Sequence, residues 1–146
     1  MSKTVVVVDT SVIMKWLSSD NEQCLDQANA ILKDVQNEKI ELFAPELAKY
    51  EVENVLLLGK KLSPQQAQIA QGEFYNLPIT FITESLNAAK VTFSLASTLG
   101  ITYYDAAFLS LAKQYNASLV TENIKHQGKT NEVKVIPLKD YYAKVA

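Results

Sequence analysis

The sequence predicts an α/β fold, a three-layer α/β/α sandwich in which helices cover both faces of a mostly parallel sheet. Short segments rich in β-branched residues alternate with segments that carry the apolar spacing of helices, the order expected when helices join parallel strands. The first segment, residues 4–8, is β-branched throughout, which is typical of a strand buried on both faces. The length of 146 residues fits a single domain, 1–146.

Five strands are expected, each short and bounded by polar or turn-forming residues. The first ends on Asp9, a carboxylate at the end of a strand that the sequence predicts to be buried. The expected strands are residues 4–8, 40–45, 78–82, 117–121 and 132–137.

Helices are expected between these strands, with recognisable starts and ends. Ser63 and Thr83 are expected caps, and Pro64 stands in the first turn after Ser63. Gly59 and Gly100 are expected helix ends. The expected helices are residues 11–17, 22–37, 45–58, 83–100 and 102–116, a helix beginning at 63, and a short one from 139.

Composition limits the chemistry that the chain can use. The net charge is −2 and all 14 basic residues are lysine, so phosphate binding must use lysine, backbone N–H groups or a metal ion. Cys24 is the only cysteine, which excludes an intramolecular disulfide and a cysteine-cluster metal site. No apolar run is long enough for a membrane span, and the N-terminus does not have the pattern of a signal peptide. We therefore expect a cytoplasmic protein with no membrane association.

Four polar residues distant in sequence are expected to meet at one edge of the sheet. Asp9 ends the first strand, Asp105 lies in the first turn of a helix, and Asn123 follows the fourth strand. Glu51 lies in the second turn of its helix, from which its side chain reaches back toward the same edge. Clustered carboxylates repel one another unless a cation neutralises them, and hard oxygen ligands suit Mg²⁺ or Mn²⁺.

Four segments in order, "VVVVDTSVIMKWL", "PELAKYEVENVLL", "TYYDAAFLSLAKQYNASLVTEN" and "VKVIPL", resemble the PIN-domain family, and especially its small prokaryotic VapC-like members. The resemblance runs from residue 4 to about 138. It implies a parallel sheet between helices and an endoribonuclease that depends on Mg²⁺ or Mn²⁺. It also implies the toxin of a toxin–antitoxin pair, with RNA as the substrate, a small antitoxin protein as partner, and a homodimer.

The resemblance assigns roles to individual residues. The family's first aspartate falls on Asp9, its glutamate on Glu51 and its helix-start aspartate on Asp105. These three would be catalytic metal ligands. Ser11 and Thr121 would be supporting residues, the first as the neighbouring hydroxyl and the second at the start of the family's T-x-D turn.

One position departs from the family pattern. Asn123 stands where the T-x-D turn has an aspartate, so the site loses one negative charge and the fourth catalytic and metal ligand would be weak or water-mediated. The neighbouring Glu122 is a candidate substitute. Lys15, Lys125 and Lys129 are candidate contacts to RNA phosphates.

Each candidate also has a purely structural explanation. Asp9 is a suitable helix cap, and Asp105 complements a helix dipole. Glu51 shares its helix with two other glutamates, so a solvent-exposed role is open. Thr121 and Asn123 are ordinary turn residues.

Two other functions remain open at this point. The first is a catalytically weak or inactive PIN-fold module that binds RNA or protein, because Asn123 replaces the usual acid. The second is a phosphotransfer domain with Asp9 as nucleophile, although Ser11 stands where haloacid-dehalogenase-like enzymes have a second aspartate. Nucleotide-binding folds are disfavoured, because neither of the glycine-rich motifs G-x-G-x-x-G and G-x-x-x-x-G-K occurs. His126, the single histidine, is expected to be exposed to solvent.

Overall fold

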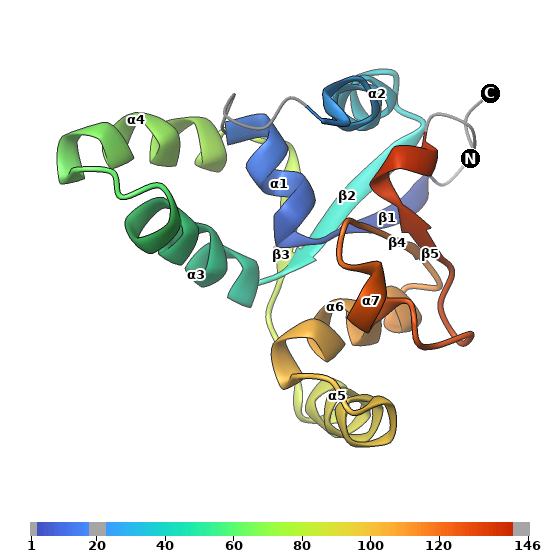
Figure 1. The fold of residues 1–146 in the computed structure, drawn as a ribbon. Helices are drawn as coiled ribbons and strands as arrows, with labels where there is room; N and C mark the ends of the chain where they lie inside the picture. Colours follow the sequence, from blue (N-terminus) through green and yellow to red (C-terminus); the bar gives the residue numbers. More distant parts are fainter. Residues whose placement is uncertain (1–2, 18–22, 142–146) are drawn as a thin grey trace.

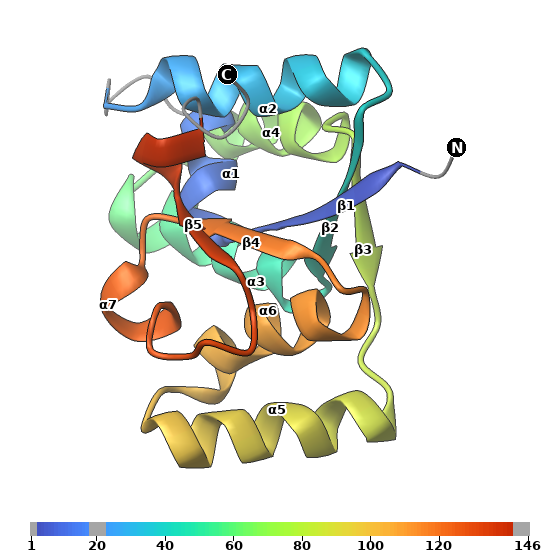
Figure 2. The same ribbon diagram turned by 90° about the vertical axis from the view of Figure 1, so that its right-hand side faces the viewer.

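Five parallel strands form one sheet in the computed structural model, which describes residues 3–17 and 23–141 (Figures 1 and 2). The strand order is β3-β2-β1-β4-β5, and every neighbouring pair is parallel. This confirms the α/β fold expected from the alternating segments. The strands are β1 (Thr4–Val8), β2 (Ile40–Pro45), β3 (Ile79–Ile82), β4 (Ser118–Thr121) and β5 (Val135–Pro137).

The order of the strands reverses at β1. The chain proceeds from β1 outward to β2 and β3, and then returns to the other side of β1 to form β4 and β5. Loops that leave the carboxyl ends of β1 and β4 therefore turn toward opposite faces, and in open α/β sheets the resulting crevice is the usual binding site.

Helices cover both faces of the sheet (Figure 2). On one face, α1 contacts β4 and α2 contacts β2; on the other, α6 contacts β1, β2 and β4, and α5 packs on α6. The helices are α1 (Thr10–Leu17), α2 (Leu25–Gln36), α3 (Leu47–Asn54), the π-helix η1 (Val55–Gly59), α4 (Pro64–Tyr75), α5 (Leu86–Leu99), α6 (Tyr103–Gln114), α7 (Ile124–Gln127) and the 3₁₀ helix η2 (Leu138–Asp140).

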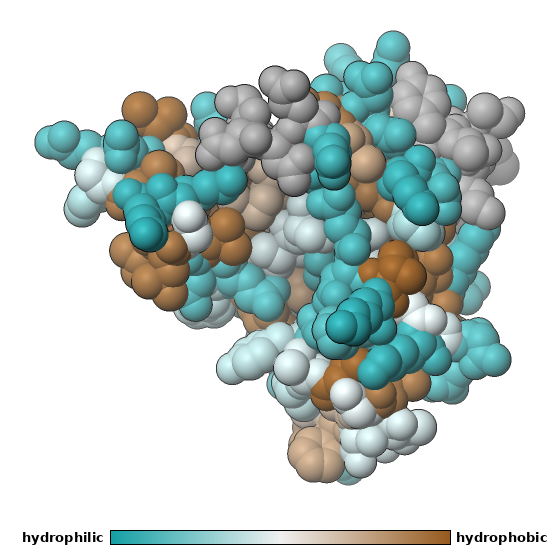
Figure 3. Space-filling model, in the orientation of Figure 1, coloured by the Kyte–Doolittle hydropathy of each residue, from teal (hydrophilic) through white to brown (hydrophobic). Residues whose placement is uncertain are grey.

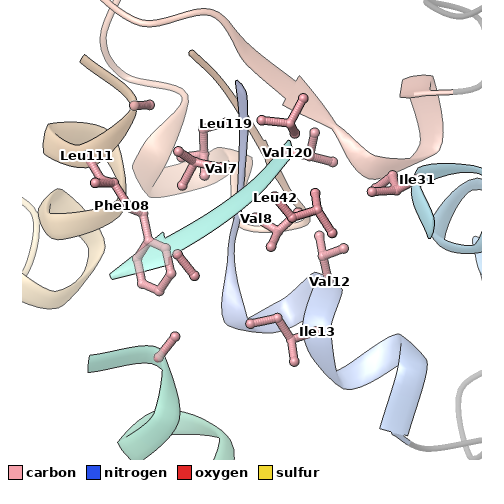
Figure 4. Close-up of a cluster of buried hydrophobic side chains, with 14 of the residues drawn as sticks. Val7, Val8, Val12, Ile13, Ile31, Leu42, Phe108, Leu111, Leu119 and Val120 are labelled. Carbon is pink, nitrogen blue, oxygen red and sulfur yellow. The ribbon is translucent and has the colours of Figure 1, made fainter. Parts of the chain in front are cut away.

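The core lies on both sides of β1, as its uninterrupted β-branched sequence requires. Val7 pairs with Leu119 of β4, and both lie beside Phe108 of α6 (Figure 4). Val8 pairs with Val120, and these two point to the opposite face, toward α1 and α2. All five side chains are buried. The buried strand β1 therefore ends immediately before Asp9.

Two expected helix starts are wrong. Pro45 does not open a helix, because β2 continues through it and pairs with Ile82 of β3. Proline is compatible with the end of a strand, where no ladder N–H is needed from it. The cap of α5 is Ser85, whose hydroxyl accepts from the N–H of Ala88 at 3.1 Å, and not Thr83.

One expected helix and one expected strand differ in extent from the structure, whereas two expected helix termini are confirmed. The helix expected over 45–58 is divided into α3 and η1, and the strand expected over 132–137 is only Val135–Pro137. The start expected at Glu22 lies outside the described residues. Ser63 does cap α4 through a reciprocal capping box with Gln66, and Gly100 ends α5 with φ of 65°.

Candidate active site at the carboxyl edge

Asp9 follows β1 directly and is almost completely buried. Its Oδ2 accepts two hydrogen bonds from Ser11, one from the backbone N–H at 3.1 Å and one from the hydroxyl at 2.6 Å. Its main-chain oxygen accepts from the N–H groups of Val12 and Ile13. Asp9 therefore does start α1, as a helix-capping residue would. Its other carboxylate oxygen, Oδ1, takes no part in these contacts with Ser11.

Glu51 is held by a hydroxyl from another element. Thr10, the first residue of α1, donates its hydroxyl to Glu51 Oε1 at 2.7 Å and so links α1 to α3. Burial raises the pKa of the Glu51 carboxyl above its ordinary value of 4.5, the Thr10 hydrogen bond lowers it, and the charges of Asp9 and Asp105 raise it further. Asp9 and Asp105 are therefore near enough for their charges to act on the Glu51 carboxyl.

Asp105 lies in the first turn of α6, whose cap is Thr102. The Thr102 hydroxyl accepts from the Asp105 N–H at 3.0 Å. Asp105 Oδ1 accepts from the side-chain amide of Asn123 at 3.1 Å. The amide nitrogen of Asn123, and not its oxygen, faces the carboxylate in this arrangement.

The turn after β4 is fastened to the turn after β1. Thr121 is fully buried, and its hydroxyl accepts from the Asn123 N–H at 2.8 Å, a local turn contact. The Ser11 hydroxyl accepts from the Glu122 N–H at 3.1 Å while it donates to Asp9. Ser11 therefore joins the two strand ends at the point where the strand order reverses.

Sequence reasoning missed two residues of this edge. The sequence motifs assign no role to Thr10, yet its hydroxyl holds Glu51. The motifs assign no role to Gln127 either, but it ends the short helix α7 and is fully buried. It donates its side-chain amide to Asp9 Oδ1 at 3.3 Å and to the Asp105 main-chain oxygen at 3.2 Å. The spacing of Asn123 and Gln127, one helical turn, is the only sequence signal that indicates a shared face.

The basic candidates have different surroundings. The side chain of Lys15 is only 4% exposed, and its ammonium group lies 3.4 Å from Glu122 Oε1, so it does not present a free cation to a phosphate. Lys125 is exposed. Lys129 is exposed and its ammonium group lies 3.4 Å from the Leu99 main-chain oxygen. His126 is partly buried, contrary to the expectation that it is exposed.

The donor set at this edge fits a hard divalent cation. It contains the carboxylates of Asp9, Glu51 and Asp105 and the amide of Asn123, with no sulfur or imidazole, the chemistry that Mg²⁺ and Mn²⁺ prefer. Among residues 3–17 and 23–141, no three Asp, Glu, His or Cys side chains form a group that could hold a metal ion. Each carboxylate is turned toward its own hydroxyl or amide partner instead. Burial is the main cause of the raised pKa of Glu51, and a cation would offset the smaller contribution that the charges of Asp9 and Asp105 make to it.

A recess on the surface gives access to Glu51. Its lining comes from α3 and from the start of α6, and Figure 3 shows a hollow between these parts of the surface. The lining residues are Leu47, Tyr50, Glu51, Asn54 and Tyr104.

Fold and site together define an α/β protein with an acidic, oxygen-rich edge where its strand order reverses. The sequence matches the PIN domain family over residues 6–130. The chain therefore belongs to the PIN domain family, and the resemblance inferred from its motifs is confirmed. None of the curated proteins compared with the chain matches it. No helix in the described part of the chain is long and apolar enough to cross a membrane.

Solved structures share this fold at low sequence identity. VapBC2 from Rickettsia felis, bound to a DNA fragment from its promoter, aligns with a TM-score of 0.67 at 18% identity, over 91% of this chain and 98% of that one. A protein from Pyrobaculum aerophilum aligns with a TM-score of 0.66 at 19% identity, over 98% of both chains. A toxin–antitoxin complex from Klebsiella pneumoniae aligns with a TM-score of 0.63 at 17% identity, over 91% and 97%.

Proposed function

We propose that this protein is a divalent-metal-dependent endoribonuclease and the toxin of a toxin–antitoxin pair. The observation that carries the proposal is the meeting of Asp9, Glu51 and Asp105 where the strand order reverses: the Gln127 amide contacts both aspartates, and Thr10, next to Asp9, holds Glu51. Membership of the PIN domain family, whose members are generally nucleases, supports the hydrolase class. Structural likeness to toxin–antitoxin proteins supports the biological role.

In this proposal Asp9, Glu51 and Asp105 hold Mg²⁺ or Mn²⁺, and Asn123 is a weak or water-mediated fourth ligand. When bound, such an ion activates water and polarises the scissile phosphate. The chain itself orients the acids: Ser11 fixes Asp9, and the remaining carboxylates are fixed by the hydroxyl and amide contacts described above. No side chain of the protein acts as the nucleophile.

Substrate contacts would come from the exposed side of α7. Lys125 lies on that helix and Lys129 follows it, and both are exposed to solvent. Without arginine, these lysines would bind RNA phosphates as point charges and not as bidentate forks. Lys15, which is buried and ion-paired with Glu122, would not contact RNA directly.

An antitoxin and a second copy of the chain would need apolar surface. Large apolar side chains are exposed along α3, η1 and α4 and on α5 (Figure 3). Several of them are grouped on the same elements, and such groups, unlike single exposed apolar residues, are typical of interaction surfaces. We assign these surfaces to an antitoxin and to a homodimer partner, and we place the protein in the cytoplasm. The exposed residues are Tyr50, Leu57, Leu58, Ile69, Tyr75, Leu86, Val91 and Phe93.

A second candidate function is RNA or protein binding without cleavage. The Asn123 amide nitrogen, directed at Asp105 at 3.1 Å, favours it, because this donor partly offsets the negative charge that a cation would otherwise neutralise.

The test is RNA cleavage by the purified protein in Mn²⁺ and in EDTA, compared with Asp9→Ala and Asp105→Ala. Cleavage that needs the ion and is lost in both variants supports the nuclease. Asp26→Ala on the exposed side of α2 is a matched control and should cleave like the wild type. RNA binding without cleavage in Mn²⁺ would favour the second candidate, and cleavage that persists in both site variants would contradict the proposed site.

A further inference from the structure

Gln127 uses both hydrogens of its side-chain amide at the acidic edge. The nitrogen Nε2 lies 3.3 Å from Asp9 Oδ1 and 3.2 Å from the main-chain oxygen of Asp105. These two acceptors belong to segments that are 96 positions apart in the numbering, 9 and 105. One amide group therefore touches both aspartates.

The orientation of this amide is fixed by its partners. A carboxylate oxygen and a carbonyl oxygen only accept, so the nitrogen of Gln127 must face them. The other end, Oε1, is buried and has no hydrogen-bond partner among the described residues. A buried, unpaired oxygen is unfavourable. Any stabilisation that the polar end of this side chain provides must therefore come from the two hydrogen bonds that its nitrogen donates.

The backbone of α7 holds Gln127 in place. Its N–H donates to the Asn123 main-chain oxygen at 3.0 Å, which closes the single turn of the helix. Gly128 follows, and a Cβ at that position would lie only 2.6 Å from the Ile124 main-chain oxygen. The turn thus presents Asn123 and Gln127 to Asp105 together, one to its carboxylate and one to its main chain.

The hydrogen bonds of Asp9 leave one direction open. Its Oδ2 accepts two bonds from Ser11, which uses the acceptor capacity of that oxygen. Among the described residues its Oδ1 accepts only from Gln127, so one lone-pair direction on Oδ1 remains. Gln127 and a cation can therefore share Oδ1 without competing for one position.

We propose that Gln127 is a positioning residue of the acidic edge: its amide holds the Asp9 carboxylate against the start of α6 and thereby sets the relation of Asp9 to Asp105 that a divalent cation requires. This inference rests on the proposed function. Partners that orient metal-binding carboxylates typically contribute about 10–100-fold to metal affinity or activity.

The direct test replaces the amide by an apolar group of similar length. Gln127→Met should weaken Mn²⁺ binding, measured by calorimetry on the full chain, by about 10–100-fold. Its melting temperature should fall, because Asp9 Oδ1 and the Asp105 main-chain oxygen lose a donor, although the substitution also removes the unpaired Oε1. Gln71→Met is the matched control: Gln71 also donates its amide to a carboxylate, that of Glu53 at 2.8 Å, but on α4. It should bind Mn²⁺ like the wild type.

A second variant and a measurement on the wild type keep the inference testable if Gln127→Met does not fold. Gln127→Leu should show the same loss of Mn²⁺ affinity. In wild-type protein titrated with Mg²⁺, the side-chain amide signals of Gln127 in NMR spectra should shift with the same midpoint as metal binding, and those of Gln71 should not.

The outcomes separate this inference from the proposed function. If the wild type binds no Mn²⁺ or Mg²⁺ and cleaves no RNA, the proposed function fails and the inference fails with it. If the wild type binds metal and cleaves RNA but Gln127→Met binds Mn²⁺ equally well or more tightly, or if the Gln127 amide signals do not respond to Mg²⁺, only the positioning role is overturned.

Discussion

Two buried aspartates of this protein have opposite surroundings. Asp34 of α2 and Asp9 are 8% and 7% exposed. Asp34 accepts one short hydrogen bond, at 2.6 Å, from the Tyr141 hydroxyl. Asp9 accepts three, from Ser11 and Gln127, and still lies near Glu51 and Asp105. Burial alone does not make a site, because Asp34 is about equally buried and its carboxylate has a single neutral partner within residues 3–17 and 23–141.

The pKa shifts around the two aspartates differ in cause. Burial, and then the hydrogen bond and charge of Asp34, raise the pKa of Tyr141 well above its ordinary value of 10.0, so the tyrosine keeps its proton and remains a donor. At the acidic edge, the raised pKa belongs to an acid, Glu51, and other acids contribute to it. Asp34 is hydrogen-bonded to a proton donor, whereas at the acidic edge the charges of two carboxylates act on a third, Glu51. Four substitutions test this difference.

The largest effect should follow the loss of charge at Asp9. We expect Asp9→Asn to lower Mn²⁺ affinity and RNA cleavage by at least about 100-fold, because an amide is a poor substitute for a carboxylate ligand. Calorimetry and a cleavage assay measure the two effects. Asp34→Asn is the matched control at equal burial and should retain both properties. Equal loss in the two variants would remove the distinction between the aspartates.

Tyr141→Phe should destabilise the fold without changing the site. The substitution leaves the Asp34 carboxylate buried without its hydroxyl donor, so we expect the free energy of unfolding to fall by about 1–3 kcal/mol. Urea denaturation measures this loss, and Mn²⁺ affinity should be unchanged. Tyr75→Phe, on an exposed ring, should alter stability by less than about 0.5 kcal/mol. A large loss of Mn²⁺ affinity in Tyr141→Phe would show that the two regions are coupled.

Asn123→Asp should increase the charge excess at the edge. Replacing the amide that lies 3.1 Å from Asp105 by a carboxylate should lower the melting temperature of the metal-free protein and tighten Mn²⁺ binding by about tenfold, an effect of order 1 kcal/mol for adjacent charges near a surface. Differential scanning fluorimetry with and without Mn²⁺ measures both. The exposed Asn116→Asp is the control, and an unchanged response to Mn²⁺ would argue against Asn123 as a ligand.

Glu51→Gln should have the smallest effect, and its sign depends on pH. Because folding raises the pKa of Glu51, the carboxyl contributes its full stability below its ordinary value of 4.5, and that contribution is lost as pH rises through the folded pKa. Metal-free Glu51→Gln should therefore melt above the wild type at pH 7, with the difference disappearing below pH 4.5. Melting curves across this range test it against the exposed Glu73→Gln. A variant that is less stable than the wild type at pH 7 would contradict the repulsion.

The strands could be predicted closely because their signal is local. The β-branched run of residues 4–8 and the segment 40–45 correspond to β1 and β2 without change. The helix starts were less predictable. Pro45 has the helix-opening signature but continues β2, because pairing with Ile82 stabilises the strand. The preference of proline for a helix start is overridden there by pairing with a residue that lies 37 positions later in the sequence.

The candidate site was predictable in its acids but not in the residues that orient them. Asp9 and Asp105 stand at helix starts and in motifs, so local sequence identifies them. Thr10 and Gln127 have no such signal, because each acts on an element distant in sequence. Lys15 was also a candidate phosphate contact, and only the packing of α1 buries its side chain and places its ammonium group beside Glu122.

The sequence by itself determined which segments become strands and where each strand ends, because side-chain branching, alternation and capping act over a few residues. Only the tertiary structure decided which of the strand ends became neighbours and which hydroxyl or amide faces each acid. Hydrogen bonds that join segments a hundred residues apart depend on the relative placement of whole elements, and that placement is set by packing over the entire core.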